Sequence, residues 1–466
     1  METTRQARTD VLILGGGPSG IQTTNLLRQH NPELEVTVIR PERYSMIYCA
    51  LPYALEGLFP LEKTYKKDGL ITDCGGKLIQ DKAVAVDLES QVVTLGSGAT
   101  IGYDKLVIAT GADPVRPPIP GIDLQNIFTV KTQEDAQRII SVLTCGCCGD
   151  GELVKCSLDG PKKVVVVGAG AIGMEQATAY RAQGLEVHLV ELLGWPLPQM
   201  LDEDMAEPVI EALKEEGINL HFGVAVEAFE GEEAVGSVQL ANGDKIELEA
   251  GQDFVVVAIG MRPAVALFKD SALQLDRDGI VVDEHMRTNL PNVWAAGDCC
   301  QFVSGLDGKP IGGKLATNAV PMAKIAAFDI LGKQARYPGF FNGAATVVGK
   351  LRVGSTGFSE RVAAQRGFEV YTAYGETTSR FPMMPGADTV RIKLVVEKET
   401  RRLLGAQAWG SEAIAERIDL LTLALQQHLT VDQLAEFSYS AQPWQTFFPA
   451  RNAIVEAAQR AAGLLK

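Results

Sequence analysis

The sequence lacks any apolar run that approaches the roughly 18 residues needed to cross a lipid bilayer. Met1–Asp10 is a short polar stretch without the hydrophobic segment of a secretory signal. Positive charge is also in deficit, because 43 lysines and arginines stand against 58 acidic residues and give a net charge of -15. Such a charge repels phosphodiester backbones and anionic lipids. We therefore expect a cytoplasmic protein that binds neither nucleic acid nor membranes.

Aromatic residues are scarce, at 6%, but 46% of the 466 residues are hydrophobic and 22% are charged. These values are typical of a folded globular protein and exclude a disordered or fibrous chain. Because one hydrophobic core rarely organises more than about 250–300 residues, the length predicts roughly three domains. The eight cysteines are unevenly spaced. In a reducing compartment this favours catalytic or metal-binding thiols over a structural disulfide framework.

Two glycine-rich turns, each between a β-branched run and a helical pattern, are the main organisational signal. The first turn reads G-G-G-P-S-G and the second reads G-A-G-A-I-G. In such turns the first glycine permits a tight bend, the second lets the backbone approach a pyrophosphate, and the third lets the helix pack closely on the strand. The pyrophosphate lies at the helix N-terminus. The pattern predicts two dinucleotide sites, built on Gly15, Gly17, Gly20, Gly168, Gly170 and Gly173.

Further strands and a change of pattern indicate how the chain is divided. Segments 105–111 and 254–260 are predicted to be buried strands that end at a glycine, and segment 288–298 places Asp298 at its carboxyl end. From about residue 340 alternating strands are followed by an amphipathic helix. We predict an α/β fold with two Rossmann-like domains of three ββα layers and a C-terminal α+β domain. The predicted boundaries are 1–130 and 286–338 for the first domain, 131–162 for a linker, 163–285 for the second and 339–466 for the third.

These features together resemble the FAD-dependent pyridine nucleotide–disulfide oxidoreductases over nearly the whole chain. The resemblance implies that the first turn binds FAD, that the second binds NADH or NADPH, and that Asp298 hydrogen-bonds the ribityl chain of the flavin. It also implies a homodimer formed through the C-terminal domain, in which the partner subunit helps to close the active site. The residues expected to complete the two cofactor sites are Ala109, Thr110, Gly111, Gly260 and Gly297.

Cys49 places the resemblance in the branch with a single redox-active cysteine. The first domain has no pair of cysteines separated by four residues, and Cys49, within S-M-I-Y-C-A-L-P-Y, stands in its place. It opens a short predicted helix, and a helix N-terminus beside an oxidised flavin favours the thiolate form of a cysteine. The branch contains coenzyme A disulfide reductases, NADH-dependent persulfide or polysulfide reductases, and NADH oxidases and peroxidases. The alternative is a buried structural cysteine.

The first glycine turn also bears on the substrate. Members of the family that reduce peroxide or oxygen typically carry a histidine there, whereas this chain has Pro18 and its five histidines lie elsewhere. This favours sulfur–sulfur substrates. We expect an NADH-dependent FAD enzyme that reduces a disulfide, polysulfide or persulfide, such as coenzyme A disulfide, through Cys49. The alternatives are an NADH oxidase or peroxidase, and an electron-transfer flavoprotein that hands electrons to a partner protein.

The residue that ends the second strand of each unit usually decides how a ribose is recognised. Glu191 is expected to accept hydrogen bonds from both ribose hydroxyls of NADH and to repel the extra phosphate of NADPH. In the first unit Arg40 occupies the place where FAD-binding copies usually have glutamate. Glu42, two residues later, or backbone contacts would then hold the adenosine of FAD.

Tyr439 lies in a stretch that resembles the place where coenzyme A disulfide reductases often carry a tyrosine. It is expected either to donate a proton to a leaving thiolate or to pack at the dimer interface. The other candidate region has phenylalanine at Phe381, where a tyrosine is sought. This puts coenzyme A specificity in doubt and leaves smaller sulfur substrates open.

The remaining cysteines form two groups. Four thiols within the predicted linker are spaced C-x-C-C-x7-C, which suits zinc or an iron–sulfur cluster, a thiol/disulfide relay, or a loop without a cofactor. A cluster there would serve the electron-transfer alternative. Cys299 and Cys300 follow Asp298 directly and are expected to pack beside the flavin. The candidate metal ligands are Cys145, Cys147, Cys148 and Cys156.

Overall fold

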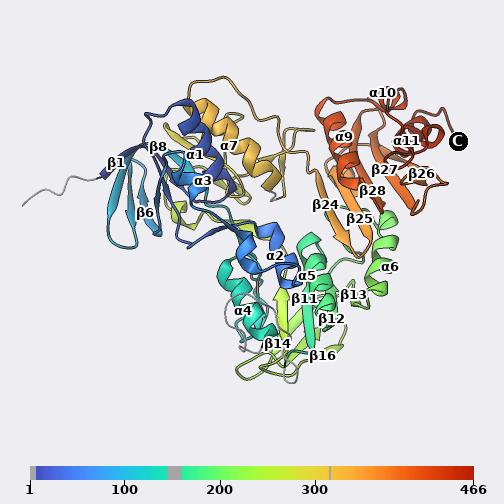
Figure 1. The fold of residues 1–466 in the computed structure, drawn as a ribbon, viewed down its shortest axis with the longest axis horizontal. Helices are drawn as coiled ribbons and strands as arrows, with labels where there is room; N and C mark the ends of the chain where they lie inside the picture. Colours follow the sequence, from blue (N-terminus) through green and yellow to red (C-terminus); the bar gives the residue numbers. More distant parts are fainter. Residues whose placement is uncertain (1–6, 145–159, 314–315) are drawn as a thin grey trace, which may run out of the picture.

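The computed structural model describes residues 7–144, 160–313 and 316–466. Figure 1 shows three parts: a first one drawn in blue and gold, a second in teal to lime, and a third in orange and red. Helix α7 (Ala316–Ile330) packs against α1 (Pro18–His30), so the first part combines early and late segments of the chain. The predicted α/β class, with two Rossmann-like domains and a C-terminal α+β domain, is confirmed.

The first domain is built on a seven-stranded sheet in the order β5-β2-β1-β8-β7-β6, with β21 also paired to β8. Strands β5, β2, β1, β8 and β21 are parallel, and β6 and β7 form an antiparallel extension. The central strand β1 is fully buried along its apolar half, as its run of β-branched residues and leucines predicts. The strands are β1 (Ala7–Leu14), β2 (Val36–Ile39), β5 (Lys77–Ile79), β6 (Ala83–Asp87), β7 (Val92–Leu95), β8 (Thr100–Ile108) and β21 (Val293–Ala295).

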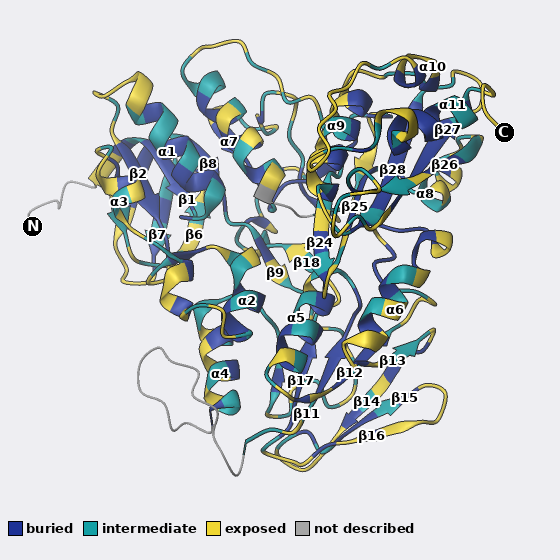
Figure 2. Cartoon of the chain, turned by 45° about the vertical axis from the view of Figure 1, so that its right-hand side comes forward, coloured by how far each residue is buried: buried dark blue, intermediate teal, exposed yellow. Residues whose placement is uncertain are grey.

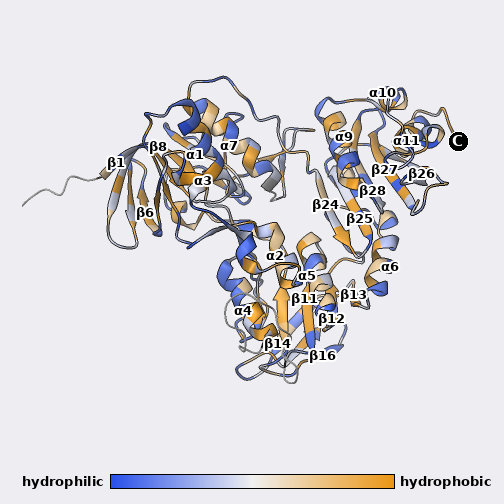
Figure 3. Ribbon diagram, in the orientation of Figure 1, coloured by the Kyte–Doolittle hydropathy of each residue, from blue (hydrophilic) through white to orange (hydrophobic). Residues whose placement is uncertain are grey.

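The second domain has a five-stranded parallel sheet in the order β10-β17-β11-β12-β13. Alternate residues of β11 point to opposite faces: Val164 and Val166 pack on the helix side, whereas Val165 and Val167 pack against the antiparallel sheet β14-β15-β16. Both faces of β11 pack against apolar side chains, so residues on both faces must be apolar. Figure 3 shows β11 as strongly hydrophobic. The strands of the main sheet are β10 (Ile127–Phe128), β11 (Lys163–Val167), β12 (Glu186–Glu191), β13 (Asn219–Phe222) and β17 (Phe254–Val257).

The other elements of the second domain cover its sheet. Helix α4 begins at Gln133, within the predicted linker, and its N-cap Thr132 forms a capping box with Asp135. The helices are α4 (Gln133–Leu143), α5 (Ala171–Ala182) and α6 (Glu207–Glu215), and the antiparallel strands are β14 (Val226–Glu230), β15 (Ser237–Leu240) and β16 (Lys245–Glu247).

The third domain is an antiparallel sheet in the order β24-β25-β28-β27-β26, and α9 and α11 pack against it. Figure 2 shows strands β27 and β28 of this sheet as largely buried. The elements are β24 (Ala344–Val348), β25 (Leu351–Gly357), α8 (Glu360–Gln365), β26 (Val370–Thr378), β27 (Thr389–Glu397), β28 (Leu403–Gly410), α9 (Ile414–Gln426), α10 (Val431–Ala435) and α11 (Ala453–Ala461). None of the helices among the described residues is long and apolar enough to cross a membrane.

Two-stranded ribbons and short helices complete the description of the fold. The ribbon of β9 and β18 joins the segment after β8 to the segment after β17, and so links the first two domains. The ribbons are β3 (Ser45–Met46) with β4 (Tyr65–Lys66), β9 (Ala112–Pro114) with β18 (Met261–Pro263), β19 (Leu275–Asp276) with β20 (Gly279–Ile280), and β22 (Phe302–Val303) with β23 (Pro310–Ile311); the short helices are α2 (Leu51–Leu55) and α3 (Gly69–Thr72).

A buried lysine joins the second domain to the third. The Lys393 side chain is 1% exposed, and its ammonium lies 3.1 Å from Asp202, 2.7 Å from Asp204 and 3.0 Å from Glu360. The hydrogen bonds and charges of these carboxylates raise the pKa of Lys393 against the opposing effect of burial. Without the ammonium, three carboxylates would face one another at a domain junction.

We expect Lys393→Ala to lower the free energy of unfolding by about 3 kcal/mol, because removing one partner leaves uncompensated charge in a partly buried cluster. Chemical denaturation followed by circular dichroism measures the change. The control is Lys398→Ala, since Lys398 forms an exposed ion pair with Glu369 and its loss is expected to cost at most about 1 kcal/mol. Equal effects of the two substitutions would contradict the assigned role of Lys393.

Candidate active site

The first glycine turn connects β1 to α1 and leaves open space at its second glycine. Gly15 has a φ of +115°, and a Cβ there would overlap the carbonyl oxygen of Ala109. A Cβ on Gly20 would overlap the carbonyl oxygen of Gly15, so strand and helix approach as closely as the motif predicts. Apart from the two neighbouring residues of the chain, no described atom lies within 4 Å of a Cβ placed on Gly17. The turn therefore fits a pyrophosphate at the N-terminus of α1.

The carboxyl ends of β1, β8 and β21 bring the remaining first-domain residues to this turn. Ala109 donates its backbone N–H to the carbonyl of Leu14 at 2.8 Å, and Thr110 and Gly111 follow. Gly297 has a φ of +87°, and a Cβ there would lie 2.5 Å from the hydroxyl of Ser19. Asp298 comes next. Because parallel strands end at one edge of the sheet, segments as far apart in the chain as Gly15 and Gly297 meet at one place.

The second glycine turn has the same construction. Gly168 has a φ of +103°, and a Cβ on it would lie 2.6 Å from the carbonyl oxygen of Ala258, close to Gly260. The space around Gly170 is open within 4 Å among the described atoms. The two oxygens of Glu191 accept the backbone N–H groups of Ala169, at 2.8 Å, and Leu193, at 2.9 Å. This fixes the carboxylate at the end of β12, beside the turn.

Arg40, the departure from the usual pattern, faces its own loop. Its guanidinium donates to the carbonyls of Glu42, at 2.8 Å, and Arg43, at 2.7 Å, and pairs with Asp68 at 2.9 Å. The arginine is 2% exposed, and its aliphatic stem packs under Gly16. The Glu42 side chain is exposed. Arg40 thus shapes the loop that leads from β2 to the Cys49 segment.

Cys49 lies in a single turn of 3-10 helix, Tyr48–Ala50, directly before α2. It is exposed, which disagrees with the alternative of a buried structural cysteine. The α2 helix is anchored on both sides: Leu55 joins the core of the second domain, and Leu51 and Ala54 pack with Ala136 of α4. The cysteine is therefore an accessible thiol on a fixed support.

Lys66 is a cation near Cys49 that the sequence reasoning missed. It lies on β4, which pairs with β3 just before the cysteine segment. Burial lowers the pKa of Lys66, and the charge of a Cys49 thiolate acts in the opposite direction. The charge of a Cys49 thiolate and the charge of the Lys66 ammonium therefore attract each other. Lys66 comes near Cys49 only because the two-residue strands β3 and β4 pair. No sequence motif indicates this pairing.

Tyr48 and Lys131 are two further site residues that the sequence analysis did not predict. The Lys131 ammonium lies 5.7 Å from the centre of the Tyr48 ring. Burial lowers the pKa of Lys131, while the carboxylates of Asp113 and Asp298 raise it. Burial, with help from Glu42, raises the pKa of Tyr48 to about 12. A buried cation and a protonated phenol thus lie near Asp298.

Tyr53 and Glu175 form a contact between domains that the sequence does not indicate. The Tyr53 hydroxyl donates to Oε1 of Glu175 at 3.4 Å, and Thr346 of β24 donates to the same oxygen at 2.9 Å. Glu175 lies on α5, two residues after the last glycine of the second turn. In Figure 2 the labels α2, α5 and β24 lie close together, and the helices α2 and α5 and the pair α5 and β24 are in contact.

The other predicted residues lie apart from Cys49 or outside the described part. Tyr439 belongs to the C-terminal domain, where its hydroxyl donates to the carbonyl of Pro449 at 2.6 Å. Cys299 and Cys300 are fully buried, with sulfurs 3.9 Å apart. Among residues 7–144, 160–313 and 316–466, no group of three or more His, Cys, Asp or Glu side chains is placed to hold a metal. The four candidate ligands Cys145, Cys147, Cys148 and Cys156 lie outside the described residues.

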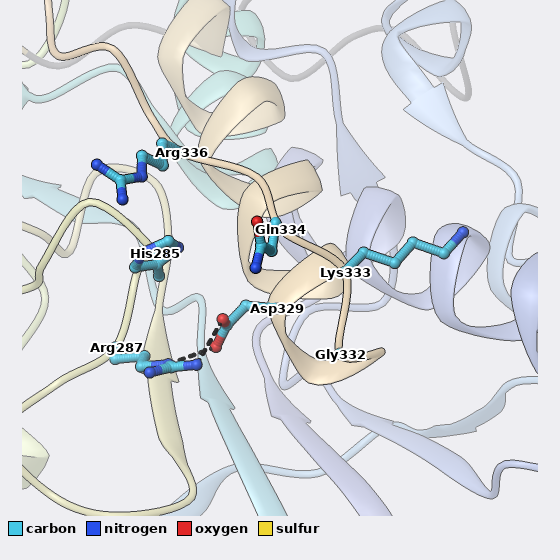
Figure 4. Close-up of a pocket in the computed structure, with 7 residues that line it drawn as sticks. All are labelled: His285, Arg287, Asp329, Gly332, Lys333, Gln334 and Arg336. Carbon is cyan, nitrogen blue, oxygen red and sulfur yellow. Dashed lines mark hydrogen bonds and ion pairs between the residues drawn. The ribbon is translucent and has the colours of Figure 1, made fainter.

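A cavity of about 300 Å³ lies at the C-terminal end of α7, whose Asp329 lines it. None of the predicted site residues lines this cavity. Figure 4 shows Arg287 beside Asp329, whose carboxylate accepts two hydrogen bonds from the guanidinium, at 2.6 and 2.7 Å. Arg336, also in the lining, pairs with Glu284 at 3.1 Å. The cavity is thus bordered by paired charges, and the candidate active site remains the region around the two glycine turns and Cys49.

Comparisons with known proteins agree with this geometry. The family described as pyridine nucleotide-disulphide oxidoreductase matches residues 9–323, and its dimerisation domain matches residues 344–446. The chain belongs to this family of oxidoreductases. It is 31% identical to an NADH oxidase of Methanocaldococcus jannaschii, over 93% of this chain and 94% of that protein. It is 30% identical to an NAD(P)H coenzyme A polysulfide/persulfide reductase of Pyrococcus horikoshii, over 90% of this chain and 91% of that one.

Two solved structures extend the similarity. The NAD-dependent persulfide reductase of A. fulgidus superposes with a TM-score of 0.90 at 30% identity, covering 98% of this chain and 83% of that chain. The water-forming NADH oxidase of Lactobacillus brevis bound to NADH superposes with a TM-score of 0.88 at 25% identity, covering 98% of both chains. The chain is thus similar both to sulfur reductases and to oxidases.

We expect Gly17→Ala to leave the fold intact but to reduce the flavin content of the purified protein. A Cβ at this position meets open space in the protein, so its cost falls on the pyrophosphate that would approach the backbone. Flavin absorbance relative to protein measures the content, and thermal unfolding without flavin checks the fold. The control is Gly194→Ala in the second domain, an exposed glycine that likewise has an ordinary φ and open space for a Cβ. Normal flavin content in Gly17→Ala would contradict the assignment of the turn.

Proposed function

We propose that this protein is an NADH-dependent FAD enzyme that reduces a disulfide, polysulfide or persulfide of a small molecule through Cys49. The observation that carries the proposal is an exposed thiol on an anchored turn, close to Lys66 and connected in sequence to the first dinucleotide site. The similarity to the persulfide reductases of P. horikoshii and A. fulgidus supports the same substrate class. Coenzyme A disulfide or persulfide is the substrate to test first.

The two dinucleotide sites are assigned to FAD and to NADH. Gly15, Gly17, Gly20, Ala109, Thr110, Gly111, Gly297 and Asp298 would hold FAD, with Glu42 near its adenosine; Gly168, Gly170, Gly173, Gly260 and Glu191 would hold NADH. The bound flavin supplies the chemistry of accepting a hydride from NADH and delivering two electrons to sulfur. Lys131 places a positive charge near Asp298, where it balances the carboxylate.

The residues of this chain carry the sulfur steps. The exposed thiolate of Cys49 attacks one sulfur of the substrate, and its charge interacts with that of Lys66. A bond forms between Cys49 and that sulfur as the substrate's sulfur–sulfur bond breaks. The first thiol leaves, and two electrons from NADH later release the second. The anchored α2 helix holds the sulfur in place through both steps.

The third domain would supply the homodimer and the second wall of the site. The match to a dimerisation domain supports this arrangement. Tyr439 is exposed by 37% and belongs to the segment between α10 and α11, two helices that Figure 1 draws well away from α2, so a role near Cys49 would require the partner subunit. Its hydroxyl hydrogen is engaged with Pro449, which favours packing at the interface over proton donation. Both roles stay predictions.

An NADH oxidase is the second candidate, favoured by the similarity to the enzyme of M. jannaschii. Pro18 occupies the place in the first turn where oxygen-reducing relatives would have a proton-donating histidine. Steady-state rates with coenzyme A disulfide, polysulfide, hydrogen peroxide and oxygen separate the candidates. We expect the sulfur substrates to be preferred, and a higher kcat/KM for oxygen would favour the oxidase.

Replacing Cys49 is expected to separate the two half-reactions. In Cys49→Ser, NADH should still bleach the flavin, because hydride transfer does not involve the thiol, while turnover of sulfur substrates should fall by more than about 10³-fold. Stopped-flow absorbance and steady-state assays measure the two. Cys74→Ser is the control, since that thiol donates to the carbonyl of Ile71 away from the site. Turnover of sulfur substrates by Cys49→Ser at the wild-type rate would contradict the proposal.

The choice of NADH is expected to depend on Glu191. Glu191→Gln removes a charge that repels the phosphate of NADPH, so the preference for NADH over NADPH should fall about tenfold, an effect of about 1.4 kcal/mol. The ratio of the two kcat/KM values measures it. Glu186→Gln changes the same residue type at the opposite end of β12 and should leave the ratio unchanged. An unchanged ratio in Glu191→Gln would show that another residue selects the cofactor.

A further inference from the structure

Two of the five histidines form a bonded pair on adjacent strands of the second domain. Nδ1 of His188 on β12 lies 2.9 Å from Nε2 of His221 on β13, and the stacked rings have centroids 5.2 Å apart. In the sheet His188 pairs with Val165 and His221 with Val190, two valines that pack against β14, β15 and β16. Figure 1 shows β12 and β13 side by side. Because β13 is the edge strand, the imidazoles tie this edge to the sheet.

The hydrogen-bond partners define where the protons of the pair lie. Nε2 of His188 lies 2.8 Å from Oε1 of Glu186, and this hydrogen bond lowers the pKa of Glu186 and keeps it ionised. Because a carboxylate only accepts, Nε2 of His188 carries a hydrogen. A neutral His188 then accepts at Nδ1 from His221, and a protonated His188 donates to a neutral His221. With both rings protonated, two N–H groups oppose each other and the bond is lost.

Charged groups face the pair from the neighbouring elements. Glu186 shares β12 with His188, and Lys163 of β11 pairs with Glu186 at 3.5 Å. Burial, followed by the charge of His188, lowers the pKa of His221, while Asp244, in the turn between β15 and β16, acts in the opposite direction. The pair therefore takes up its second proton only in acid, below the ordinary histidine pKa of about 6.5.

The residues that follow β13 hold the backbone of the ribose end of the second dinucleotide site. Gly223 donates its N–H to the carbonyl of Leu193 at 2.9 Å, and Val224 donates to the carbonyl of Glu191 at 3.2 Å. The imidazole pair lies two residues before these contacts on β13 and three before them on β12. Displacement of β13 would therefore displace the backbone that carries the carboxylate assigned to the ribose of NADH.

We propose that His188 and His221 are positioning residues of the NADH site and that they make NADH binding sensitive to pH. While the imidazoles share a hydrogen bond, they hold β13 against β12 and keep Glu191 in place. In acid a second proton makes both rings cationic, the bond breaks, and the edge strand loosens. NADH then binds tightly only after one proton has left the pair. The inference rests on the proposed assignment of NADH to the second glycine turn.

Stopped-flow measurement of flavin reduction by NADH tests the inference in the FAD-loaded enzyme. Each experiment lasts seconds, so NADH survives in acid buffers. From about pH 7.5 to about pH 5.5 the half-saturating NADH concentration of the wild type should rise about fivefold, the factor that corresponds to one net hydrogen bond. At each pH the limiting rate should be the same in the wild type and in variants of the pair, because the pair positions NADH and takes no part in hydride transfer.

Two substitutions of His221 separate the hydrogen bond from its titration. The amide of His221→Gln reaches the place of Nε2 and can donate to a neutral His188 or, after turning over, accept from a protonated one. This variant should bind NADH as the wild type does at about pH 7.5 and lose the acid decline. His221→Phe keeps a stacked ring but not the bond, so its half-saturating concentration should be raised about fivefold at both pH values.

The outcomes distinguish this inference from the proposed function. An acid decline that persists in His221→Gln would overturn the inference, because Glu191 or another group would then cause it. A wild type without the decline, or wild-type affinity in His221→Phe, would overturn it as well. The control is His285→Gln, which removes an imidazole bonded to the carbonyl of Ala335 in the first domain and should keep the wild-type profile. If NADH reduces the flavin of the wild type at no pH, the proposed function itself fails.

Discussion

The close approach of backbone segments at the carboxyl ends of parallel strands determines the rest of the structure. At Gly15 and Gly20 the main chain comes so near to neighbouring carbonyl oxygens that no side chain fits, and the same is true at Gly168 and Gly173. At Gly17 and Gly170 the same geometry leaves open space beside a helix N-terminus. Residues distant in sequence converge on these turns because the parallel sheets end there.

The second constraint is the way in which the Cys49 turn is supported. Its helix α2 belongs to the first domain by sequence but contributes Leu55 to the core of the second, and Tyr53 reaches Glu175 across the same junction. The third domain contributes Thr346 to this contact and Lys393 to a separate one with Asp202. The position of the thiol thus depends on contacts among all three domains.

The sequence predicted what depends on local pattern. The two glycine turns and the buried strands carry the α/β fold, because tight turns and valine-rich runs are local signals, and they bring Ala109 to Gly15 as the strand pattern requires. The amphipathic helix predicted after the strands of the third domain is observed as α9, Ile414–Gln426. Helix α4 was not predicted within the linker, although its capping box, Thr132 with Asp135, was a readable signal.

Tertiary contacts explain what sequence reasoning missed. Glu175 and Tyr53 are 122 positions apart, and only domain packing joins them. Lys131 follows no motif, and Lys66 reaches Cys49 through a ribbon of two-residue strands. The sequence shows that Arg40 departs from the glutamate usual at this position. It does not show that the Arg40 side chain fixes its own loop by donating to the carbonyls of Glu42 and Arg43. Roles for the assigned cofactor residues stay predictions that the geometry supports.

Rapid-quench mass spectrometry of the sulfur intermediate tests the central claim most directly. The FAD-loaded enzyme is mixed with coenzyme A disulfide in the absence of NADH, quenched, and digested under conditions that preserve disulfides. The account predicts one coenzyme A adduct on the peptide that contains Cys49, and its disappearance after NADH is added. An adduct confined to another cysteine, or an adduct on Cys49 that NADH does not remove, would contradict the account.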